Sequence, residues 1–316
     1  MVNVLLKSVC KAMERIAPLR LAEKWDNVGL LLESPVQRQG RGKVLLTIDL
    51  TSSVLAESLS KETSVIVAYH PTIFKGLQSF TLSNPLQASL LQCAAHGISV
   101  YSPHTALDSV WGGINDWLAE GLMKGKDDGE IRSLICEKLN AASGESEGAE
   151  GRLVTLREPI GMDVLEKRIK SYLKLSQSLS CSSFPSSNPH VLIDKPYPTH
   201  ACWRLIVQVG YPGSRESRSA PIQSIAICAG SGGSMLLGQE ADVYLTGEMS
   251  HHEVLAAVAA GKHVILCGHT NTERGYLPIL AAKLRHELQT SDFKDQGLGD
   301  VEVLVSEKDQ HPLEFV

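Results

Sequence analysis

Short apolar runs alternate with amphipathic stretches along the first 123 residues. The apolar runs are rich in aliphatic and β-branched residues, which is typical of buried strands, and they lie at 43–50, 64–68 and 97–102. Between and after them, apolar positions recur at helical spacing and predict helices at 52–61, 85–96 and 113–122. This alternation indicates an α/β layered domain whose sheet is at least partly parallel.

The second half of the chain repeats the same alternation. Strands are predicted at 152–156, 204–209, 224–229, 241–245, 262–267 and 301–306. Helical spacing predicts helices at 162–174, 234–237, 250–260 and 277–288. We therefore expect a second α/β layered domain that packs against the first with approximate pseudo-symmetry.

A polar stretch separates the two halves. Residues 124–151 end in a Gly/Ser/Glu run without an apolar period, which predicts an inter-domain linker. The predicted domains are thus 1–123 and 152–316. Within the second domain, the Ser/Pro-rich residues 176–200 predict an irregular or mobile excursion.

Composition narrows the class of protein. The 30 basic and 35 acidic residues give a formal net charge of −5, so we do not expect direct binding to DNA or RNA. No uninterrupted apolar run reaches the roughly 18 residues of a membrane span. The 7 cysteines form no CxxC motif, which favours a reduced, cytoplasmic protein, with the nucleus as a second expected location. Residues 1–20 are compatible with an amphipathic presequence helix, although Glu14 argues against that targeting role.

Histidines and carboxylates follow several of the predicted strands. His70 follows the run 64–68, His104 and Asp108 follow 97–102, and His269 and Glu273 follow 262–267. In open α/β sheets, sites form at the carboxyl ends of strands, so these loops can converge on one cleft. Imidazole and carboxylate ligands favour Zn, Mn, Fe, Co or Ni over Ca. The pattern therefore predicts one or two divalent ions that polarise a substrate oxygen and activate water.

Structural interpretations of the same residues stay open at this point. His70 can be a strand-end residue whose ring is satisfied, and Asp108 can cap the helix predicted near residue 113. Glu273 stands three residues after Thr270, which is capping-box spacing.

Three further segments carry candidate chemistry. The Gly-rich turn at 229–234 can cradle an anion or simply join a strand to a helix. After the strand at 241–245, Glu248, His251 and His252 are candidates for proton transfer, while Ser250 is the expected helix cap. Asp26 is expected to support a turn, with a substrate contact as the alternative. No GxSxG elbow is present, and no cysteine stands beside a clear base.

Together these segments resemble the NIF-three-like family (NGG-interacting-factor-three-like, also labelled GTP cyclohydrolase one type two), of the eukaryotic type. The matching segments are KWDNVGLLL (24–32), LTIDLT (46–51), AYHPTIFKG (68–76), YSPHTALD (101–108), CAGSGGSML (228–236), ADVYLTGEMSHHE (241–253) and GHTNTERGYL (268–277). The resemblance implies two α/β domains around a metal cleft and homo-oligomers that are often hexameric rings. It also implies metal ligands at His70, Asp108, His269 and Glu273, with His104 adjacent.

One position departs from the family pattern. Many bacterial members carry two consecutive histidines where this chain has Tyr69 and His70. Tyrosine, whose pKa is about 10, is a poorer ligand near neutral pH. We therefore expect one of the two metal positions to be weaker, differently ligated or empty.

The functional expectation is a metal-dependent hydrolase that acts on a small phosphorylated or nucleotide-like substrate. The resemblance also implies an alternative, a non-enzymatic transcriptional corepressor that acts through protein partners and keeps a structural or vestigial metal. A third interpretation is a metal-handling or delivery protein.

Overall fold

A five-stranded sheet forms the core of the first half of the molecule. The computed structural model describes residues 4–38, 42–175, 207–213, 220–290 and 301–312. The strands are β1 (Gly29–Leu32), β2 (Lys43–Thr47), β3 (Val65–Ala68), β4 (Ser99–Ser102) and β11 (Glu302–Val305), in the order β1-β4-β3-β2-β11. All neighbouring strands run parallel except β1, which pairs antiparallel with β4.

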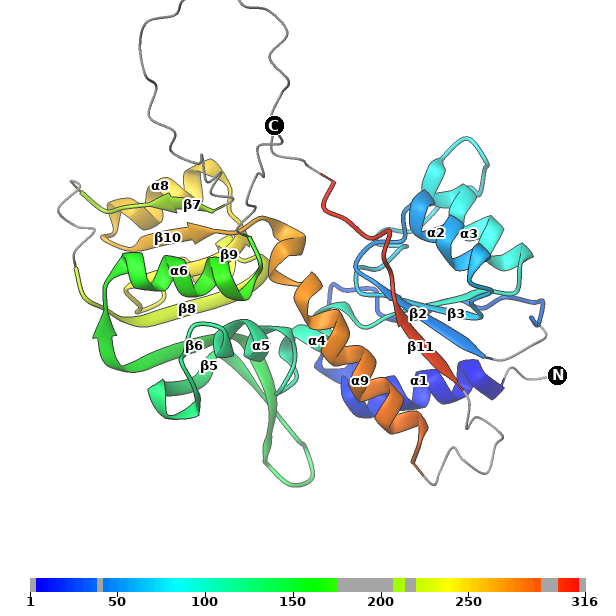
Figure 1. Cartoon of the computed structure of the whole chain (residues 1–316), viewed down its shortest axis with the longest axis horizontal. Coiled ribbons are helices and arrows are strands. Elements are labelled where there is room, and N and C mark those ends of the chain that lie inside the picture. Colours follow the sequence, from blue (N-terminus) through cyan, green and yellow to red (C-terminus); the bar gives the residue numbers. More distant parts are fainter. Residues whose placement is uncertain (1–3, 39–41, 176–206, 214–219, 291–300, 313–316) are drawn as a thin grey trace, which may run out of the picture.

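Helices cover both faces of this sheet, because successive side chains of its strands point to opposite faces and those on both faces are buried. On one face, Leu45, Ile66 and Val100 pack with α2 (Ser52–Ser60) and α3 (Pro85–Ala95). On the other face, the cluster that includes Val44 and Val67 joins α1 (Val4–Ile16) and α9 (Leu277–Leu288), which pack together (Figure 1). Because both faces are covered, the central strands β2, β3 and β4 are buried at nearly every position.

A six-stranded sheet forms the core of the second half. Its strands are β5 (Gly129–Leu139), β6 (Ser146–Ile160), β7 (Gln208–Gly210), β8 (Ile222–Ser231), β9 (Val243–Glu248) and β10 (His263–Leu266), in the order β5-β6-β8-β9-β10-β7. The central strands β8, β9 and β10 are parallel, and the outer pairings are antiparallel. This confirms the predicted α/β class with two layered sheets.

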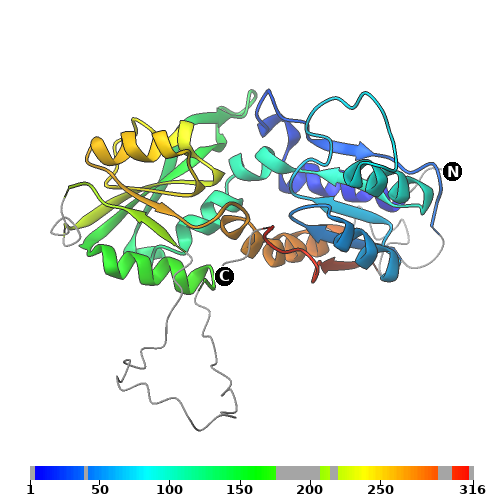
Figure 2. The same ribbon diagram turned by 90° about the horizontal axis from the view of Figure 1, so that it is seen from above.

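Short helices cover the second sheet and connect it to the first. One core of the second sheet includes α5 (Ile114–Glu120) and α6 (Met162–Tyr172), and the other includes α7 (Gly233–Leu236) and α8 (His251–Ala259). The connecting elements are α4 (His104–Ser109), η1 (Leu19–Leu21), η2 (Lys126–Asp128), η4 (His269–Thr272) and η5 (Arg274–Tyr276). Figure 2 shows the two layered halves side by side.

The predicted linker at 124–151 is wrong. These residues contain η2, all of β5 and the first part of β6, which form an antiparallel hairpin in the second sheet. The positions of β5 alternate between exposed and half-buried, so the strand has no continuous apolar run. A strand of this kind has a polar composition, which is why the hairpin resembles a linker in the sequence.

The predicted domain boundary also differs from the structure. Although β11 belongs to the segment predicted as the second domain, it pairs in parallel with β2 of the first sheet. The chain therefore returns to the first half after completing the second, and α9 packs there against α1. Residues 176–200, predicted to be irregular, lie outside the described residues.

The start of α8 is set by the side chains of neighbouring residues. Ser250 caps α8 in a capping box with Glu253, as expected. Within the described ranges, no helix is long and apolar enough to cross a membrane.

Candidate metal centre

The carboxyl ends of strands from both sheets meet at one cavity. His70 follows β3 in the first sheet, and His269 follows β10 in the second. Gly268 precedes His269 with a φ of 83°, a left-handed conformation that favours glycine and turns the chain into η4. In each half, therefore, the candidate ligand lies at the carboxyl end of a strand, where sites form in α/β sheets. The packing of the two halves brings the two loops together.

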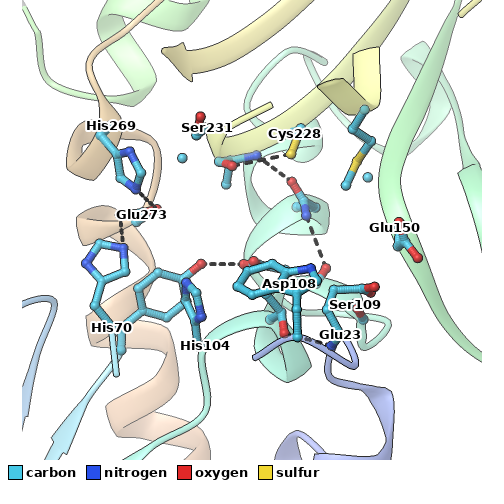
Figure 3. A pocket seen from close by; sticks show the side chains of 18 of the residues that line it. Glu23, His70, His104, Asp108, Ser109, Glu150, Cys228, Ser231, His269 and Glu273 are labelled. Atoms are coloured by element: carbon cyan, nitrogen blue, oxygen red, sulfur yellow. Dashed lines mark hydrogen bonds and ion pairs between the residues drawn. The ribbon is translucent and has the colours of Figure 1, made fainter. Parts of the chain in front are cut away.

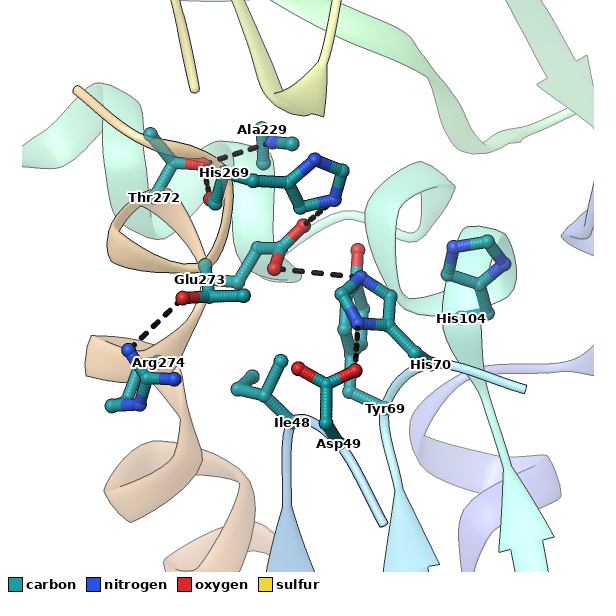
Figure 4. A network of polar contacts seen from close by, with 12 residues as sticks. Ile48, Asp49, Tyr69, His70, His104, Ala229, His269, Thr272, Glu273 and Arg274 are labelled. Atoms are coloured by element: carbon teal, nitrogen blue, oxygen red, sulfur yellow. Dashed lines mark hydrogen bonds and ion pairs between the residues drawn. The ribbon is translucent and has the colours of Figure 1, made fainter. Parts of the chain in front are cut away.

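Three side chains form the most compact group of potential metal ligands in the described part of the chain. One ligand atom from each of His70, His269 and Glu273 lies within 4.8 Å of the others. The Nε2 atom of His269 is 3.3 Å from Oε1 of Glu273, and the Nε2 atom of His70 is 3.5 Å from Oε2. Figure 4 shows the Glu273 carboxylate between the two rings.

Carboxylates on the outer side orient both imidazoles. The Nδ1 atom of His70 is 2.9 Å from Oδ1 of Asp49, and the Nδ1 atom of His269 is 2.8 Å from Oε1 of Glu248. Each ring therefore directs its Nε2 atom toward Glu273. A histidine whose second nitrogen is held by a carboxylate is the common arrangement around protein-bound metals.

The charges of the cluster are strongly coupled. Burial opposes a charge on Glu273, but its contacts with His269 and His70 hold the pKa of this carboxyl below its usual range. Burial also opposes protonation of the rings, yet the contacts with Asp49 and Glu273 raise the pKa of His70 to about 10. Contacts with Glu273 and Glu248 raise the pKa of His269 to about 9. In the absence of an ion, positive charge thus gathers on both rings around the buried carboxylate.

The surroundings of the Glu273 carboxylate show whether the cluster suits a metal ion. Its side chain is only 2% exposed, and among the described residues Oε2 makes no hydrogen bond, since Nε2 of His70 stands at an ion-pair distance of 3.5 Å. Leaving a buried carboxylate oxygen unsatisfied is costly, so such an atom calls for an explanation. A divalent cation ligated by this oxygen and the two Nε2 atoms would satisfy it, and this donor set suits Zn, Mn, Fe, Co or Ni.

Asp108 and His104 line the same cavity but have other partners. The Tyr69 hydroxyl, which is buried, donates to Oδ1 of Asp108 at 2.5 Å. Burial raises the pKa of Asp108 to about 6. The Nδ1 atom of His104 is 2.8 Å from Oδ1 of Asp26, and its ring lies 5.5 Å from the ring of His70.

The structural alternatives for these residues are resolved by their contacts. No side chain caps the start of α5, so the predicted capping role of Asp108 is wrong. Glu273 does not cap through Thr270, because its carboxylate lies between the two histidines. Asp26 does support its turn, since it accepts from the backbone of Asn27 at 2.8 Å.

The structure does not bring His251 and His252 to this cluster. Both are exposed at the start of α8, with their rings 5.6 Å apart. His251 lines a separate cavity with Met249 and residues of β7 and β10. Of the three residues predicted for proton transfer, only Glu248 contacts the cluster, and it does so by holding His269.

Three backbone N–H groups of the Gly-rich turn donate to side chains. The backbone N–H groups of Ala229, Gly230 and Gly232 donate to Asn115, Thr272 and Thr246, at 2.8, 2.8 and 3.0 Å. A Cβ atom at Gly230 would lie 2.7 Å from Oε1 of Glu273. The turn thus supports the cluster by leaving it space, which favours the strand-to-helix interpretation.

A cavity of about 620 Å³ adjoins the cluster and is lined from both halves. His70, His269 and Glu273 lie on one side of it, with Glu23, Ser109 and Glu150 across from them (Figure 3). Sequence reasoning missed Asp49, Asn115 and Thr272, which position the site. Of these three residues, only Asp49 could have been found from the sequence, because it follows β2 just as His70 follows β3.

Comparisons with known proteins identify the family to which this chain is similar. The family model described as Duf34/NIF3 (NGG1p interacting factor 3) matches residues 4–191 and 204–312. The "Protein NIF3 homolog" of Schizosaccharomyces pombe is 43% identical, covering 96% of this chain and 95% of that protein. "NIF3-like protein 1" of Drosophila melanogaster is 38% identical, covering 98% and 88%.

Solved structures support the fold alone. The Bacillus cereus protein related to NIF3 superposes with a TM-score of 0.71 at 16% identity, covering 98% of both chains. Reduced HcgD from Methanocaldococcus jannaschii superposes with a TM-score of 0.65 at 20% identity, covering 95% of this chain and 97% of that one.

Proposed function

Since this chain belongs to the Duf34/NIF3 family, we propose that it is a divalent-metal-dependent hydrolase of a small phosphorylated or nucleotide-like substrate. The observation that carries the proposal is the buried Glu273 carboxylate, whose Oε2 atom makes no hydrogen bond and lies beside two oriented imidazoles at the wall of a cavity. Such a ligand set, open to a cavity on one side, is typical of a catalytic rather than a closed structural site.

The residues around the cavity have distinct roles in this proposal. His70, His269 and Glu273 would hold the ion, and Asp49 and Glu248 would keep both Nε2 atoms directed at it. A bound divalent cation would polarise a substrate oxygen and activate water. Asp108 is the proposed proton acceptor, because its carboxyl group lines the same cavity as the three proposed ligands.

We propose a single ion rather than two. The ring of Tyr69 packs against those of His70 and His104, at 4.9 Å and 5.5 Å, and its hydroxyl binds Asp108. A second ion at Asp108 would have to displace this hydrogen bond. The burial of Tyr69 and the nearby carboxylate of Asp108 raise the pKa of its phenol well above its usual value, so it is a poor ligand.

Metal content measured on purified protein tests the site. The apo protein is loaded separately with Zn, Mn, Fe, Co and Ni, and bound metal is counted by elemental analysis. We expect about one ion per chain, lost in His269→Ala and Glu273→Ala and retained in His251→Ala, the matched histidine outside the cluster. Unchanged metal content in Glu273→Ala would contradict the proposal.

Turnover is tested separately from metal binding. Metal-loaded protein is incubated with phosphate monoesters, nucleotides and cyclic nucleotides, and product release is compared with that of Glu273→Ala. Hydrolysis by the wild type alone supports the enzyme. Full metal occupancy without hydrolysis of any of these classes would remove the enzymatic function and leave the metal as a structural element.

A protein-interaction role is the second candidate function. The family description names an NGG1p interacting factor, and a 33% identical Saccharomyces cerevisiae relative is called "NGG1-interacting factor 3". We propose that a transcriptional regulator would be bound directly as a protein, in the cytoplasm or nucleus, and not through DNA. Loss of regulator binding in a surface variant that keeps its metal would support this role.

We also propose a ring-like homo-oligomer, as the family resemblance implies. Light scattering during size-exclusion chromatography measures the mass directly. A mass of one chain, 34.2 kDa, would contradict the proposal.

A further inference from the structure

Two large aromatic side chains lie exposed at the cavity. Trp25 is 62% exposed and Phe74 is 54% exposed, and both line the cavity that contains the metal cluster. Their ring centroids are 5.9 Å apart with an interplanar angle of 56°. The two rings thus form an open wedge, and each keeps an accessible aromatic surface.

The wedge is connected to the metal centre by a short series of rings. Trp25 lies 6.0 Å from His104 at a steep angle of 79°, and Phe74 lies 6.4 Å from the same ring. His104 in turn lies 5.5 Å from His70, which belongs to the metal cluster. A molecule that touches both the wedge and the cluster therefore needs only the size of a small metabolite.

The wedge is built into the fold and is not a loose surface feature. Asp26, the neighbour of Trp25, binds Nδ1 of His104 and the backbone N–H of Thr105, at 2.8 and 3.1 Å. The Nδ2 amide of Asn27 reaches the carbonyl of Ile73 at 2.5 Å, next to Phe74. These bonds tie the two aromatic segments to each other and to α4, so the wedge is positioned before any ligand arrives.

Polar acceptors stand across the cavity from the metal cluster. Glu23 and Glu150 line that wall (Figure 3). Lys138 forms a 2.5 Å ion pair with Glu23, and Glu150 lies close to both of them. Burial and the neighbouring Glu23 raise the pKa of Glu150. This wall suits the N–H groups at the edge of a ring, because carboxyl oxygens accept hydrogen bonds from such donors.

We propose that Trp25 and Phe74 bind a planar, nitrogen-containing aromatic ring of the substrate, with its phosphate directed at the metal cluster. This inference rests on the proposed hydrolase function and names its substrate class as heteroaromatic phosphate esters. Exposed aromatic rings in a cavity lose contact with water when a flat ring stacks on them. Stacking of a base on an aromatic side chain is worth roughly 1–3 kcal/mol, which corresponds to about a 5- to 150-fold change in affinity.

The test compares probes that share a phosphate and differ in the ring. AMP, CMP and ribose 5-phosphate are titrated into metal-loaded protein, and binding is followed by calorimetry. We expect AMP and CMP to bind at least 5-fold more tightly than ribose 5-phosphate. Trp25→Ala should weaken the binding of both nucleotides by about 5- to 150-fold while leaving the binding of ribose 5-phosphate unchanged. Trp25→Phe should restore part of the loss.

Leu82→Ala is the matched control, because Leu82 is an exposed apolar residue, 71% exposed, outside the cavity lining. It should bind all three probes as the wild type does. Metal content is measured for every variant, so that a lost metal site is distinguished from a lost ring site.

Two results would overturn the inference while leaving the metal site and the hydrolase intact. One is equal affinity of AMP, CMP and ribose 5-phosphate for metal-loaded wild type, and the other is an equal loss of all three probes in Trp25→Ala. A change of oligomer mass in Trp25→Ala without a change in nucleotide affinity would assign the wedge to a protein interface instead. Failure of the wild type to bind any phosphate probe would overturn the proposed substrate class as well.

Discussion

Single residues outside the cluster hold the cavity in shape, and Arg152 is the clearest example. Its side chain is fully buried, and its guanidinium binds both oxygens of Asp116, at 3.0 and 2.6 Å. It also donates to the carbonyls of Ala149, Gly151, Ser109 and Val110. Arg152 thus fixes the chain that follows Asp108 to the second sheet.

Replacing this arginine should be severely destabilising. Arg152→Met removes the ion pair of Asp116 and the guanidinium donor of four carbonyls, and breaking a buried ion pair from one side costs about 3–5 kcal/mol. Urea denaturation followed by circular dichroism measures the loss. Arg132→Ala is the control, since Arg132 is exposed, and its stability should match the wild type. Equal stability of Arg152→Met and wild type would contradict this account.

At the scale of elements, β11 is attached to the first half by side-chain contacts as well as by strand pairing. Glu57 of α2 accepts from the backbone N–H groups of Glu307 and Lys308, at 3.0 and 3.3 Å, and from the hydroxyl of Ser306. Lys61 forms an ion pair with Glu57 at 2.8 Å. Burial opposes a charge on Glu57, but these donors lower its pKa to about 2.

The attachment of β11 should therefore be sensitive to acid. The pKa of Glu57 is lower in the folded state than in the unfolded state, so its ionisation stabilises the fold above about pH 4.5. This contribution is lost as the pH falls from 4.5 toward 2. Urea midpoints at pH 6, 4 and 3 measure it, and Glu57→Gln should start about 1–3 kcal/mol less stable and decline less. Parallel decline of both proteins would contradict the assignment.

Elements differ in how far their sequence predicts them. β2, β3 and β4 are covered on both faces and buried at nearly every position, and the apolar residues at their centres are enough to locate them. β5 has few buried positions, and its pairing with β6 is what makes it a strand. The capping box of α8 was readable because all of its groups lie within four consecutive residues.

At the scale of the whole molecule, one C-terminal residue connects the two sides of the metal centre. The Asp309 carboxylate accepts the backbone N–H of Ile48 at 3.0 Å and binds the Arg274 guanidinium at 3.3 and 3.2 Å. Ile48 precedes Asp49, which orients His70, and Arg274 follows Glu273. Asp309 therefore acts through its neighbours as a positioning residue.

Asp309→Ala should weaken metal binding without removing a ligand. Loss of this connection lets the loops that carry His70 and Glu273 move apart, and changes behind metal ligands typically cost about 10- to 100-fold in affinity. Competition with a chelating dye measures the affinity. Glu307→Ala, in the same segment but exposed, should bind metal as the wild type does. Equal affinity of the two variants would contradict the positioning role.

The sequence by itself determined the α/β class, most elements and the chemistry at the strand ends, because apolar runs, helical spacing and caps are local properties. Only the tertiary structure decided which of these residues meet. His70, His269 and Glu273 converge, while His251 and His252 do not, because the distances depend on how the two sheets pack. The same holds for β11 and the β5–β6 hairpin, whose places are set by hydrogen bonds to distant strands. No pattern within a short segment encodes those contacts.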